Sequence, residues 1–490
     1  MKKEWSGTVP QNSQRPNVVL ITCDQLRGDC LGIEHPVVET PNLDGLARSG
    51  VVFERAYSAV PSCIAARASI LTGMSQRNHG RVGYRDGVYW DYPITLPGEF
   101  AKAGYHTQGV GKMHFHPARS LCGFHNVVLH DGYLHVNRTI DKPYDNYDDY
   151  VSWLRQQTGK AFDLIDHGIN CNSWVARPWH LDEHLHPTNW VVTQSIEFLR
   201  RRDPRKPFFL WMSFVRPHAP LDPPQVYFDQ YIDQDLPLPP LGDWADQDDI
   251  ERWGLVPDTR RGLIDKRALH RARAAYYALV THIDHQIGRF LEALNETREL
   301  DNTVILFTSD HGELLGDHNL FRKSLPYEGS ARVPFVLRLP NNAERVTKTV
   351  DKPVELRDVL PTLLQAAGLP IPDTIDGKSV VPLCRGERIP WREYIHGEHS
   401  YGEDSNHWLV SRSEKYIWYS QTDREQLFDL ALDPKELRNL ADDPVWADHL
   451  RYWRSRLVEE LKDREEGYSD GKELVVGATP RACLSHVAEV

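Results

Sequence analysis

The sequence predicts an α/β protein, in which a doubly wound, mostly parallel sheet carries helices on both faces. Continuous apolar runs, rich in β-branched and aromatic residues, suit strands that are buried on both faces. Four such runs are Asn17–Cys23, Thr107–Gly111, Phe208–Val215 and Thr303–Ser309. Helical patterns lie between them at Asn42–Ser49, Ala65–Leu71, Trp190–Arg201 and Ala268–Leu294. This alternation of strand and helix is typical of a doubly wound domain.

The character of the chain changes near residue 391. Two short stretches, Glu414–Tyr419 and Glu425–Asp429, read as antiparallel strands, and a charge-rich helix is predicted at Ala447–Arg464. These elements predict a small α+β subdomain packed on the main one. The expected division is a polar N-terminal segment (1–16), a large α/β domain (17–390) and a C-terminal subdomain (391–490).

The polar tail after Glu465 has two interpretations. It either caps a neighbouring subunit, which would make the protein a homo-oligomer, or it is loose.

Composition excludes several classes of protein. The net charge of −12, with no basic stripe to offset it, argues against a general nucleic-acid binder, although a local cationic pocket can still bind an anion. No apolar run approaches the roughly 20 residues of a membrane helix. Met1 to Pro16 contains no apolar signal region, which predicts a cytoplasmic protein. The seven cysteines form no CxxC pair, so neither a zinc ribbon nor a disulfide framework is indicated.

Polar clusters follow all four predicted strands directly. They are Asp24-Gln25, Lys112-Met113-His114, Arg216-Pro217-His218 and Asp310-His311. In doubly wound sheets, functional groups gather beyond the carboxyl ends of the strands. The sequence therefore predicts that these clusters meet at one edge of the sheet.

Cys63 and Arg67 point to an anion site with a nucleophile. A helix that begins near Cys63 places both residues on one face, because they are four apart. The positive end of a helix favours an anion and acidifies a thiol. The alternative is a buried cysteine on an ordinary amphipathic helix.

The acidic residues predict a metal site. Two carboxylates, Asp24 and Asp310, would meet at one edge, which is costly without a cation between them. Ca²⁺ or Mg²⁺ takes oxygen ligands, and the Gln25 carbonyl offers another. If His311 is a further ligand, its imidazole nitrogen slightly favours Mn²⁺ or Zn²⁺ as the bound ion. The alternative is that Asp24 and Asp310 only cap the turns that follow them.

Five basic residues could surround a tetrahedral dianion, although each alone is more often a surface residue. Such a shell stabilises the charge that develops in sulfuryl or phosphoryl transfer. The five are Arg67, Lys112, His114, His218 and Lys323.

Long polar and aromatic loops are expected around this site. Residues 119–187 show weak periodicity and read either as loops that decorate the site, with Trp174 and Trp179 free to touch substrate, or as an irregular surface insertion. Rings that suit stacking on a sugar are expected in Tyr84-Arg85, Trp90, His130–His135 and Trp179–His186.

These residues, together with the segments around them, resemble the sulfatase family. The segment PSCIAARASILTG around Cys63–Arg67 is similar to the family signature, in which Cys or Ser precedes a Pro and then an Arg. Further segments look like sulfatase blocks in sulfatase order and span roughly residues 15–440. They are CDQLRGDCLG, TPNLDGLARSGVVFERAY, GKMHF, RPHAP, TSDHGELLGDHNLFRKSLPYEGSARVPF and EQLFDLALDPKELRNLADDP.

The resemblance implies an alkaline-phosphatase-like fold, with a large mixed sheet sandwiched by helices, and a set of residue roles. Cys63 would be converted to formylglycine, whose hydrated gem-diol attacks sulfur, and Arg67 and Lys112 would steady it. His114 would take a proton from the remaining hydroxyl as the intermediate breaks down, and His218 and Lys323 would bind the sulfate oxygens. The metal, usually Ca²⁺ in this family with Mg²⁺ or Mn²⁺ as alternatives, would be held by Asp24, Gln25, Cys63 (as formylglycine), Asp310 and His311.

Two departures from the family pattern matter. Ala65 stands where the family usually has Pro, which predicts less complete conversion of Cys63 or a different maturase, of the radical, oxygen-independent type. Gln25 and His311 replace groups that are Asp and Asn in many sulfatases. Choline sulfatases and phosphonate monoester hydrolases look similar at these positions.

The expected function is hydrolysis of a sulfate monoester, of a sulfated carbohydrate or an aryl sulfate, with a formylglycine-generating maturase as the partner protein. The first alternative is a phosphonate monoester hydrolase or phosphodiesterase, since phosphorus and sulfur transfer share their geometry. The second is a binding protein that keeps the fold but leaves Cys63 unmodified.

Overall fold

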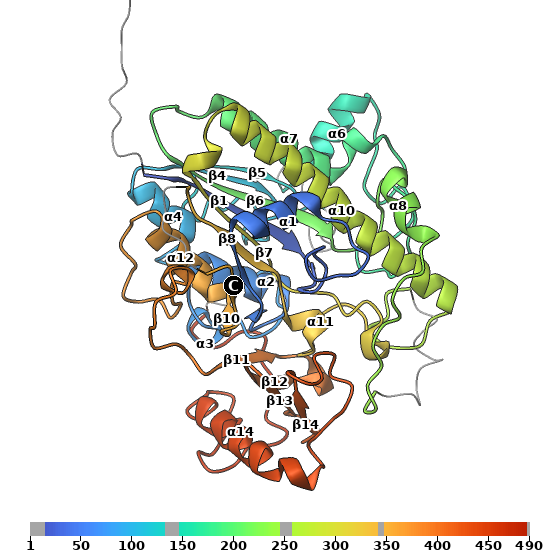
Figure 1. The fold of residues 1–490 in the computed structure, drawn as a ribbon, viewed down its shortest axis with the longest axis vertical. Coiled ribbons are helices and arrows are strands. Elements are labelled where there is room, and N and C mark those ends of the chain that lie inside the picture. Colours follow the sequence, from blue (N-terminus) through green and yellow to red (C-terminus); the bar gives the residue numbers. More distant parts are fainter. Residues whose placement is uncertain (1–14, 133–146, 246–256, 342–346, 488–490) are drawn as a thin grey trace, which may run out of the picture.

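The computed structural model describes residues 15–132, 147–245, 257–341 and 347–487, and its centre is an eight-stranded sheet (Figure 1). The strand order is β5-β4-β6-β1-β7-β8-β2-β9. β8 runs antiparallel to β7 and β2, and the other pairs are parallel. The strands are β1 (Asn17–Asp24), β2 (Val51–Phe53), β4 (His106–Gly111), β5 (Asn126–Leu129), β6 (Phe208–Pro217), β7 (Thr303–Ser309), β8 (Phe335–Arg338) and β9 (Thr349–Val350). A separate short pair joins β3 (Ala56–Tyr57) and β10 (Val354–Glu355).

The four predicted strands form the middle of this sheet and are buried along their whole lengths, except for the first residue of β4. Alternate side chains of β1 enter opposite cores, with Val19 and Ile21 in one and Val18 and Leu20 in the other. This burial on both faces explains why the strands read as continuous apolar runs. The predicted mixed, mostly parallel sheet between helices is therefore confirmed.

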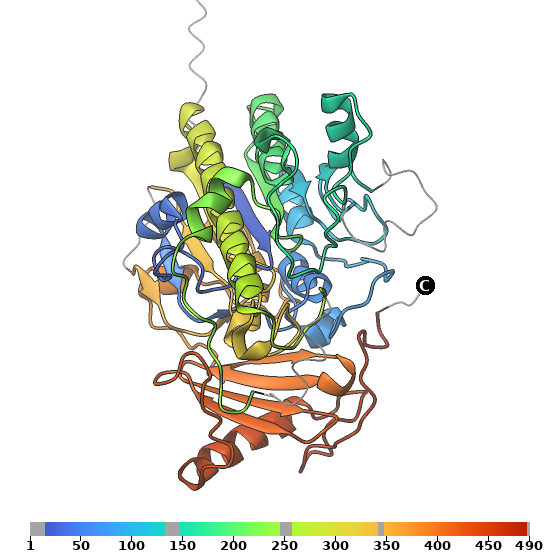
Figure 2. The ribbon, with the colours of Figure 1, turned by 90° about the vertical axis from the view of Figure 1, so that its right-hand side faces the viewer.

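Helices cover both faces of the sheet (Figures 1 and 2). One face packs against α1 (Pro41–Ser49), α7 (Pro187–Arg201), α8 (Gln225–Ile232) and α10 (Lys266–Glu296). The other packs against α2 (Cys63–Thr72), α4 (Leu96–Lys102) and α12 (Val359–Ala366). Shorter or peripheral helices are α3 (Gln76–His79), α6 (Tyr150–Thr158), α11 (Glu328–Ala331) and α13 (Val381–Cys384), with 3₁₀ turns at Glu183–Leu185, Leu300–Asn302, Asp317–Asn319, Leu356–Asp358, Gly402–Asp404 and Pro444–Trp446.

The C-terminal part adds a four-stranded antiparallel sheet, which lies below the main domain in Figure 2. Its strands, in order, are β11 (Tyr394–His399), β12 (Asn406–Ser411), β13 (Glu414–Tyr419) and β14 (Glu425–Asp429). Trp418 and Leu427 on one face pack against α14 (Ala447–Glu460), whereas Trp408 and Ile417 on the other face the main domain. The sequence predicted β13, β14 and the helix, which ends four residues earlier than expected, but it missed β11 and β12.

Two expectations about loops need correction. The tail beyond Glu465 is not loose up to residue 487, because it packs on its own chain: Cys483 forms a β-bridge with Arg81, and Leu484 N–H donates to the Gly80 carbonyl at 2.8 Å. The segment 119–187 is also more ordered than predicted, since it contains β5 and α6. The apolar residues of α6 are too few to give a clear period, because Tyr150, Val151 and Leu154 alone are buried.

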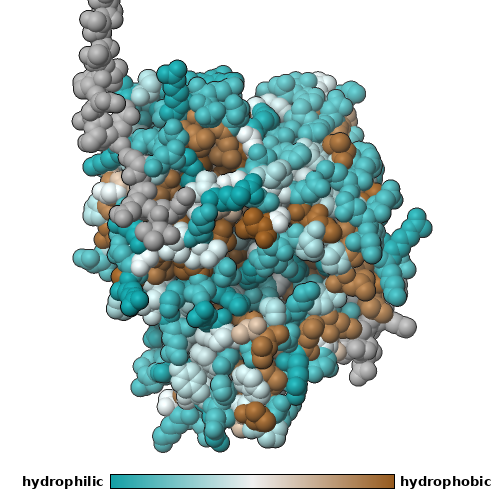
Figure 3. Space-filling view, in the orientation of Figure 1, coloured by the Kyte–Doolittle hydropathy of each residue, from teal (hydrophilic) through white to brown (hydrophobic). Residues whose placement is uncertain are grey.

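The surface is largely hydrophilic. Figure 3 shows hydrophobic residues scattered over one face of the molecule rather than gathered into a band. Within the described ranges, no helix combines the length and the apolar character needed to cross a membrane.

Candidate functional site

Asp24 and Asp310 lie side by side at the carboxyl edge of the main sheet. β1 and β7 are parallel neighbours in the register Cys23 to Ser309, so Asp24, the last residue of β1, and Asp310, the residue after β7, reach the same edge. The Asp310 amide donates to the Cys23 carbonyl at 3.2 Å. Both side chains are fully buried. Two buried carboxylates at the same edge of a sheet require positive charge nearby.

Arg67 supplies part of that charge from helix α2. The helix begins at Cys63, as expected, and ends where Gly73 adopts the left-handed conformation at φ 68°. Arg67 is fully buried, and its Nε donates to Asp310 Oδ2 at 3.0 Å. Its Nη1 donates to the Lys112 carbonyl at 2.7 Å and to Ser213 Oγ at 3.0 Å. Arg67 therefore joins α2 to strand β6 and to the residues that follow β4 and β7, which fixes where Cys63 lies.

Four side chains form a group with the chemistry of a metal site: Asp24, Cys63, Asp310 and His311. One ligand atom from each lies within 4.8 Å of the others. His311 Nε2 lies 3.3 Å from Asp24 Oδ1, 3.4 Å from Cys63 Sγ and 3.6 Å from Asp310 Oδ1. Its Nδ1 lies 2.9 Å from the Gly312 carbonyl, a contact that keeps a proton on Nδ1 and turns Nε2 toward the group.

Gln25, the fifth predicted ligand, has its side chain engaged elsewhere in this structure. Its Oε1 accepts from Lys323 Nζ at 2.5 Å, and its Nε2 donates to Glu313. Its backbone N–H donates to Asp310 Oδ1 at 3.2 Å. Gln25 thus links the metal-binding group, through its backbone N–H, to Lys323, through its side chain.

Lys112 and His114 follow β4 and approach the site from the other side. Gly111 makes this approach possible, because at its φ of 96° a Cβ would lie 2.0 Å from the Ser213 carbonyl oxygen. Lys112 Nζ forms a fully buried ion pair with Asp24. His114 Nε2 lies 3.3 Å from Asp86 Oδ1, a partner that the sequence analysis did not identify.

His218 and Lys323 form a pair at the mouth of the site. His218 follows β6, and its Nε2 lies 2.8 Å from Lys323 Nζ. Its Nδ1 lies 2.8 Å from the Ala219 carbonyl. Burial and the Lys323 charge lower the pKa of His218 to about 3, so the ring is neutral and its Nε2 accepts from Lys323.

The electrostatics favour an anion at residue 63. Burial and the Asp24 charge raise the pKa of the Cys63 thiol, but Lys112 and Lys323 outweigh them and hold it well below its usual value. Burial likewise raises the pKa of Asp24, and Lys112 more than reverses this. Burial and Asp24 raise the pKa of Asp310. Burial lowers the pKa of His311, but the Asp310 charge prevails and raises it to about 9.

A pocket of about 430 Å³ opens onto Cys63. It brings together four of the predicted residues: Cys63, His114, His218 and Lys323. Several other residues of its lining were not predicted from the sequence, including Asp86, Arg260, Arg322, His399 and Tyr401. His399 is the last residue of strand β11, and no pattern in the sequence marked it as part of the site.

Most of the aromatic residues expected to touch a sugar belong to the core instead. Trp90 and Trp179 are 8% and 6% exposed, and His186 is fully buried as the cap of α7. His130 is buried against Asp148. Of the expected rings, Tyr84 lines the pocket, whereas residues 133–135 lie outside the described ranges.

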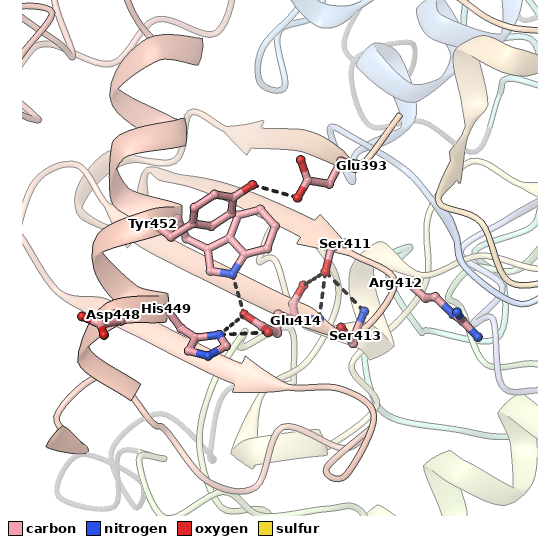
Figure 4. Close-up of a pocket in the computed structure, with 9 residues that line it drawn as sticks. Glu393, Ser411, Arg412, Ser413, Glu414, Asp448, His449 and Tyr452 are labelled. Carbon is pink, nitrogen blue, oxygen red and sulfur yellow. Dashed lines mark hydrogen bonds and ion pairs between the residues drawn. The ribbon is translucent and has the colours of Figure 1, made fainter. Parts of the chain in front are cut away.

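Two other polar features lie in the C-terminal subdomain. A surface pocket of about 520 Å³ lies between α14 and the β12–β13 turn, and several of its polar groups bind one another (Figure 4). There, His449 and Trp453 both contact Glu414, and Tyr452 donates to Glu393. A buried group of His396, Glu398 and His407 also has metal-ligand spacing, but Arg464 already binds Glu398 through two 2.8 Å hydrogen bonds.

Comparisons with known proteins match nearly the whole chain. The family model "Sulfatase" matches residues 16–369, and the model "N-sulphoglucosamine sulphohydrolase, C-terminal" matches residues 316–464. An arylsulfatase of Clostridium perfringens is 57% identical over 480 residues, which cover 96% of this chain and 100% of that protein. A choline-sulfatase of Rhizobium meliloti is 33% identical, covering 88% of this chain and 83% of its own.

A solved structure gives the same picture of the fold. The phosphonate monoester hydrolase of Agrobacterium radiobacter superposes with a TM-score of 0.75 at 26% identity. The match covers 91% of this chain and 95% of that one.

Proposed function

The chain belongs to the sulfatase family and is a sulfuric ester hydrolase, and from this premise we propose that it cleaves the sulfate monoester of an aryl alcohol or a saccharide at Cys63, after Cys63 has become formylglycine. The observation that carries the proposal is the position of Cys63. It begins a fully buried helix and touches His311 and Asp24 while lining an open pocket. A buried structural cysteine would have no reason to face both a cationic group and solvent.

The conversion of Cys63 supports turnover because covalent catalysis needs an intermediate that comes apart. Formylglycine supplies a hydrated aldehyde as nucleophile, from which sulfate leaves as the carbonyl re-forms. The partner protein we propose is a formylglycine-generating maturase, of the radical type that the Ala65 variant of the signature suggests.

A divalent cation fits the group of Asp24, Asp310, His311 and residue 63. Two carboxylates and an imidazole nitrogen are hard or borderline donors, and burial without a compensating cation is costly for both carboxylates. We propose Ca²⁺, with Mg²⁺ or Mn²⁺ as alternatives; the ion would hold the nucleophile's oxygen and polarise the sulfate. The side-chain oxygen of Gln25, the remaining predicted ligand, accepts from Lys323 while its backbone N–H donates to Asp310, so Gln25 ties the ion site to the substrate site.

The remaining residues act on the nucleophile, on the substrate and on the sulfated intermediate. Arg67 and Lys112 hold the nucleophile end in place through their bonds to Asp310 and Asp24, and Lys112 lowers the pKa of Asp24. The Lys323 ammonium donates to Nε2 of the neutral His218 ring and directs its charge toward the sulfate oxygens and the leaving oxygen. His114 lines the pocket beside Cys63 and is positioned to take the proton from residue 63 as the sulfated intermediate breaks down.

A second activity, on phosphonate monoesters, has its own support. The fold superposes on a phosphonate monoester hydrolase at a TM-score of 0.75. Sulfur and phosphorus esters pass through similar geometries and differ mainly in charge.

Kinetics on matched esters test the proposal. We expect kcat/KM for 4-nitrophenyl sulfate to exceed that for the corresponding phenylphosphonate monoester, and Cys63→Ala to abolish both activities while the melting temperature changes little. A higher kcat/KM for the phosphonate would assign the chain's main activity to the second reaction. Full activity of Cys63→Ala on the sulfate would refute the proposed nucleophile.

A further inference from the structure

The outer wall of the Cys63 pocket carries two arginines that the proposed chemistry does not use. Arg260 lies just before α10, with its guanidinium carbon 4.0 Å from the centroid of the Tyr401 ring. Arg322 precedes Lys323 in the chain and has a side chain only 15% exposed. The acid that forms an ion pair with the Arg322 guanidinium, Asp258, is 3.8 Å away and 47% exposed, so it screens that charge weakly.

The positive charge on this wall exceeds what one sulfate ester needs. A sulfate monoester carries a single negative charge, and Lys323 with His218 already faces it. Asp86, the carboxylate in the lining, pairs with His114. No carboxylate of the described ranges forms an ion pair with Arg260, and burial together with the nearby Arg322 lowers the pKa of Arg260 to about 10. Two guanidinium groups thus crowd each other beside an open pocket.

Two further groups on the same wall have unmet hydrogen-bonding capacity. His399 is 1% exposed, and among the described residues no partner forms a hydrogen bond of normal geometry with either ring nitrogen, although the Ser400 backbone lies close by. The Tyr401 hydroxyl, also buried, likewise has no partner among these residues. Buried polar atoms without partners are rare and costly. Because both residues line the pocket, their free donors and acceptors indicate a polar ligand group at this place.

We propose that Arg260, Arg322, His399 and Tyr401 form a second anion subsite, and that the preferred substrate is an organic sulfate with a second anionic group beside the ester. This inference rests on the proposed function. The second anionic group is either a carboxylate, which is planar, or a second sulfate, which is tetrahedral. A guanidinium group binds either oxyanion with two parallel hydrogen bonds. A pocket of about 430 Å³ has room for a small molecule with two such groups.

Three aryl sulfates separate the alternatives. 4-Nitrophenyl sulfate has no second anion, 2-carboxy-4-nitrophenyl sulfate adds a carboxylate, and 4-nitrocatechol disulfate adds a second sulfate. We expect the enzyme to favour at least one of the two doubly charged esters over 4-nitrophenyl sulfate by about tenfold or more in kcat/KM. The better of the two identifies the anion that the subsite takes.

Charge-removing variants test the assignment. We expect Arg260→Gln and Arg322→Gln each to lower kcat/KM for the favoured ester by about tenfold or more, and to change that for 4-nitrophenyl sulfate by less than about twofold. The matched control is Arg261→Gln. It removes the same charge from the next residue, which pairs with Asp404 outside the pocket lining, and it should leave all three rates unchanged.

The outcomes keep this inference apart from the proposed function. Turnover of 4-nitrophenyl sulfate with no preference for either doubly charged ester would overturn the subsite while the proposed function stands. An equal loss on all three esters in both arginine variants would also overturn it, because the arginines would then serve the ester itself or the fold. If no ester is turned over at all and neither doubly charged ester raises the melting temperature, both proposals fail.

Discussion

Residue 63 shows how neighbouring charges define a reactive position. Lys112 and Lys323 hold the pKa of Cys63 low against burial and against Asp24. Arg67 fixes the geometry by reaching from α2 to Asp310 and the Lys112 carbonyl. The same residues that would steady a bound sulfate therefore also favour an anionic oxygen or sulfur at the start of the helix.

Asp86 is predicted to orient His114. Its carboxylate lies 3.3 Å from His114 Nε2, and this hydrogen bond opposes the effect of burial and raises the pKa of His114. We expect Asp86→Asn to lower kcat for 4-nitrophenyl sulfate by about 10- to 100-fold, the usual cost of losing a partner that orients a catalytic imidazole. Asp91→Asn, an exposed change in the same segment, is the control and should keep the wild-type kcat. Equal kcat values for the two variants would show that Asp86 has no such role.

The elements that carry these residues are held together by contacts distant in sequence. The sheet β11–β14 brings His399 to the pocket, and Arg464 anchors β11 through Glu398. The C-terminal tail pairs with residues 80–82, which lead to Tyr84 and Asp86. Pocket geometry thus depends on the C-terminal elements as well as on the main domain.

Glu398 is predicted to give the C-terminal sheet pH-dependent stability. Burial raises its pKa, but Arg464 outweighs burial and the value falls from 4.5 to about 2. A depressed carboxyl pKa stabilises the fold above pH 4.5, and this stability is lost as the pH falls toward 2. We expect Glu398→Gln to lower the free energy of unfolding by about 3 kcal/mol at pH 7, and by much less near pH 2.

Urea unfolding of both forms across this pH range measures the effect. The exposed Glu403→Gln is the control and should unfold like the wild type at every pH. A loss in Glu398→Gln that stayed constant from pH 7 to pH 2 would mean that its cause is packing rather than charge.

Removal of the tail should weaken catalysis without unfolding the main domain. The Cys483–Arg81 bridge and the 3.0 Å hydrogen bond from Val82 N–H to the Ala482 carbonyl hold the segment that leads to Tyr84 and Asp86. We expect truncation before residue 479 to lower kcat by about tenfold or more, since small displacements of catalytic groups are costly. Truncation before Ser485 keeps the bridge and is the control. Unchanged kcat in the longer deletion would contradict the role given to the tail.

For the whole molecule, much of the site was predictable because it obeys a general rule of parallel sheets. Asp24, Lys112, His218 and Asp310 follow buried strands, so their convergence at one edge follows from topology alone. Arg260 and His399 were not predictable in this way. They reach the pocket from a loop and from an antiparallel strand of another sheet, and no periodic pattern links them to Cys63. The burial of Trp90 and Trp179 was also hidden, because an aromatic residue in an irregular segment can serve either the core or a ligand.

The metal is predicted to be required for the activity of the whole enzyme. We expect a chelator to abolish turnover and Ca²⁺ to restore it, and titration calorimetry to show one ion bound per chain. Asp24→Asn and Asp310→Asn should abolish this binding, because each removes an anionic ligand. His407→Ala, which disrupts the other buried group with ligand spacing, should leave Ca²⁺ binding intact. Binding lost only in His407→Ala would place the ion in the C-terminal sheet instead.

The most direct test of the central claim is the mass of the peptide that contains residue 63, taken from enzyme that turns over an aryl sulfate. We expect an aldehyde or its hydrate in place of the thiol, in a fraction that rises in step with kcat across preparations made with and without a maturase. Fully active enzyme whose Cys63 is entirely an unmodified thiol would contradict it.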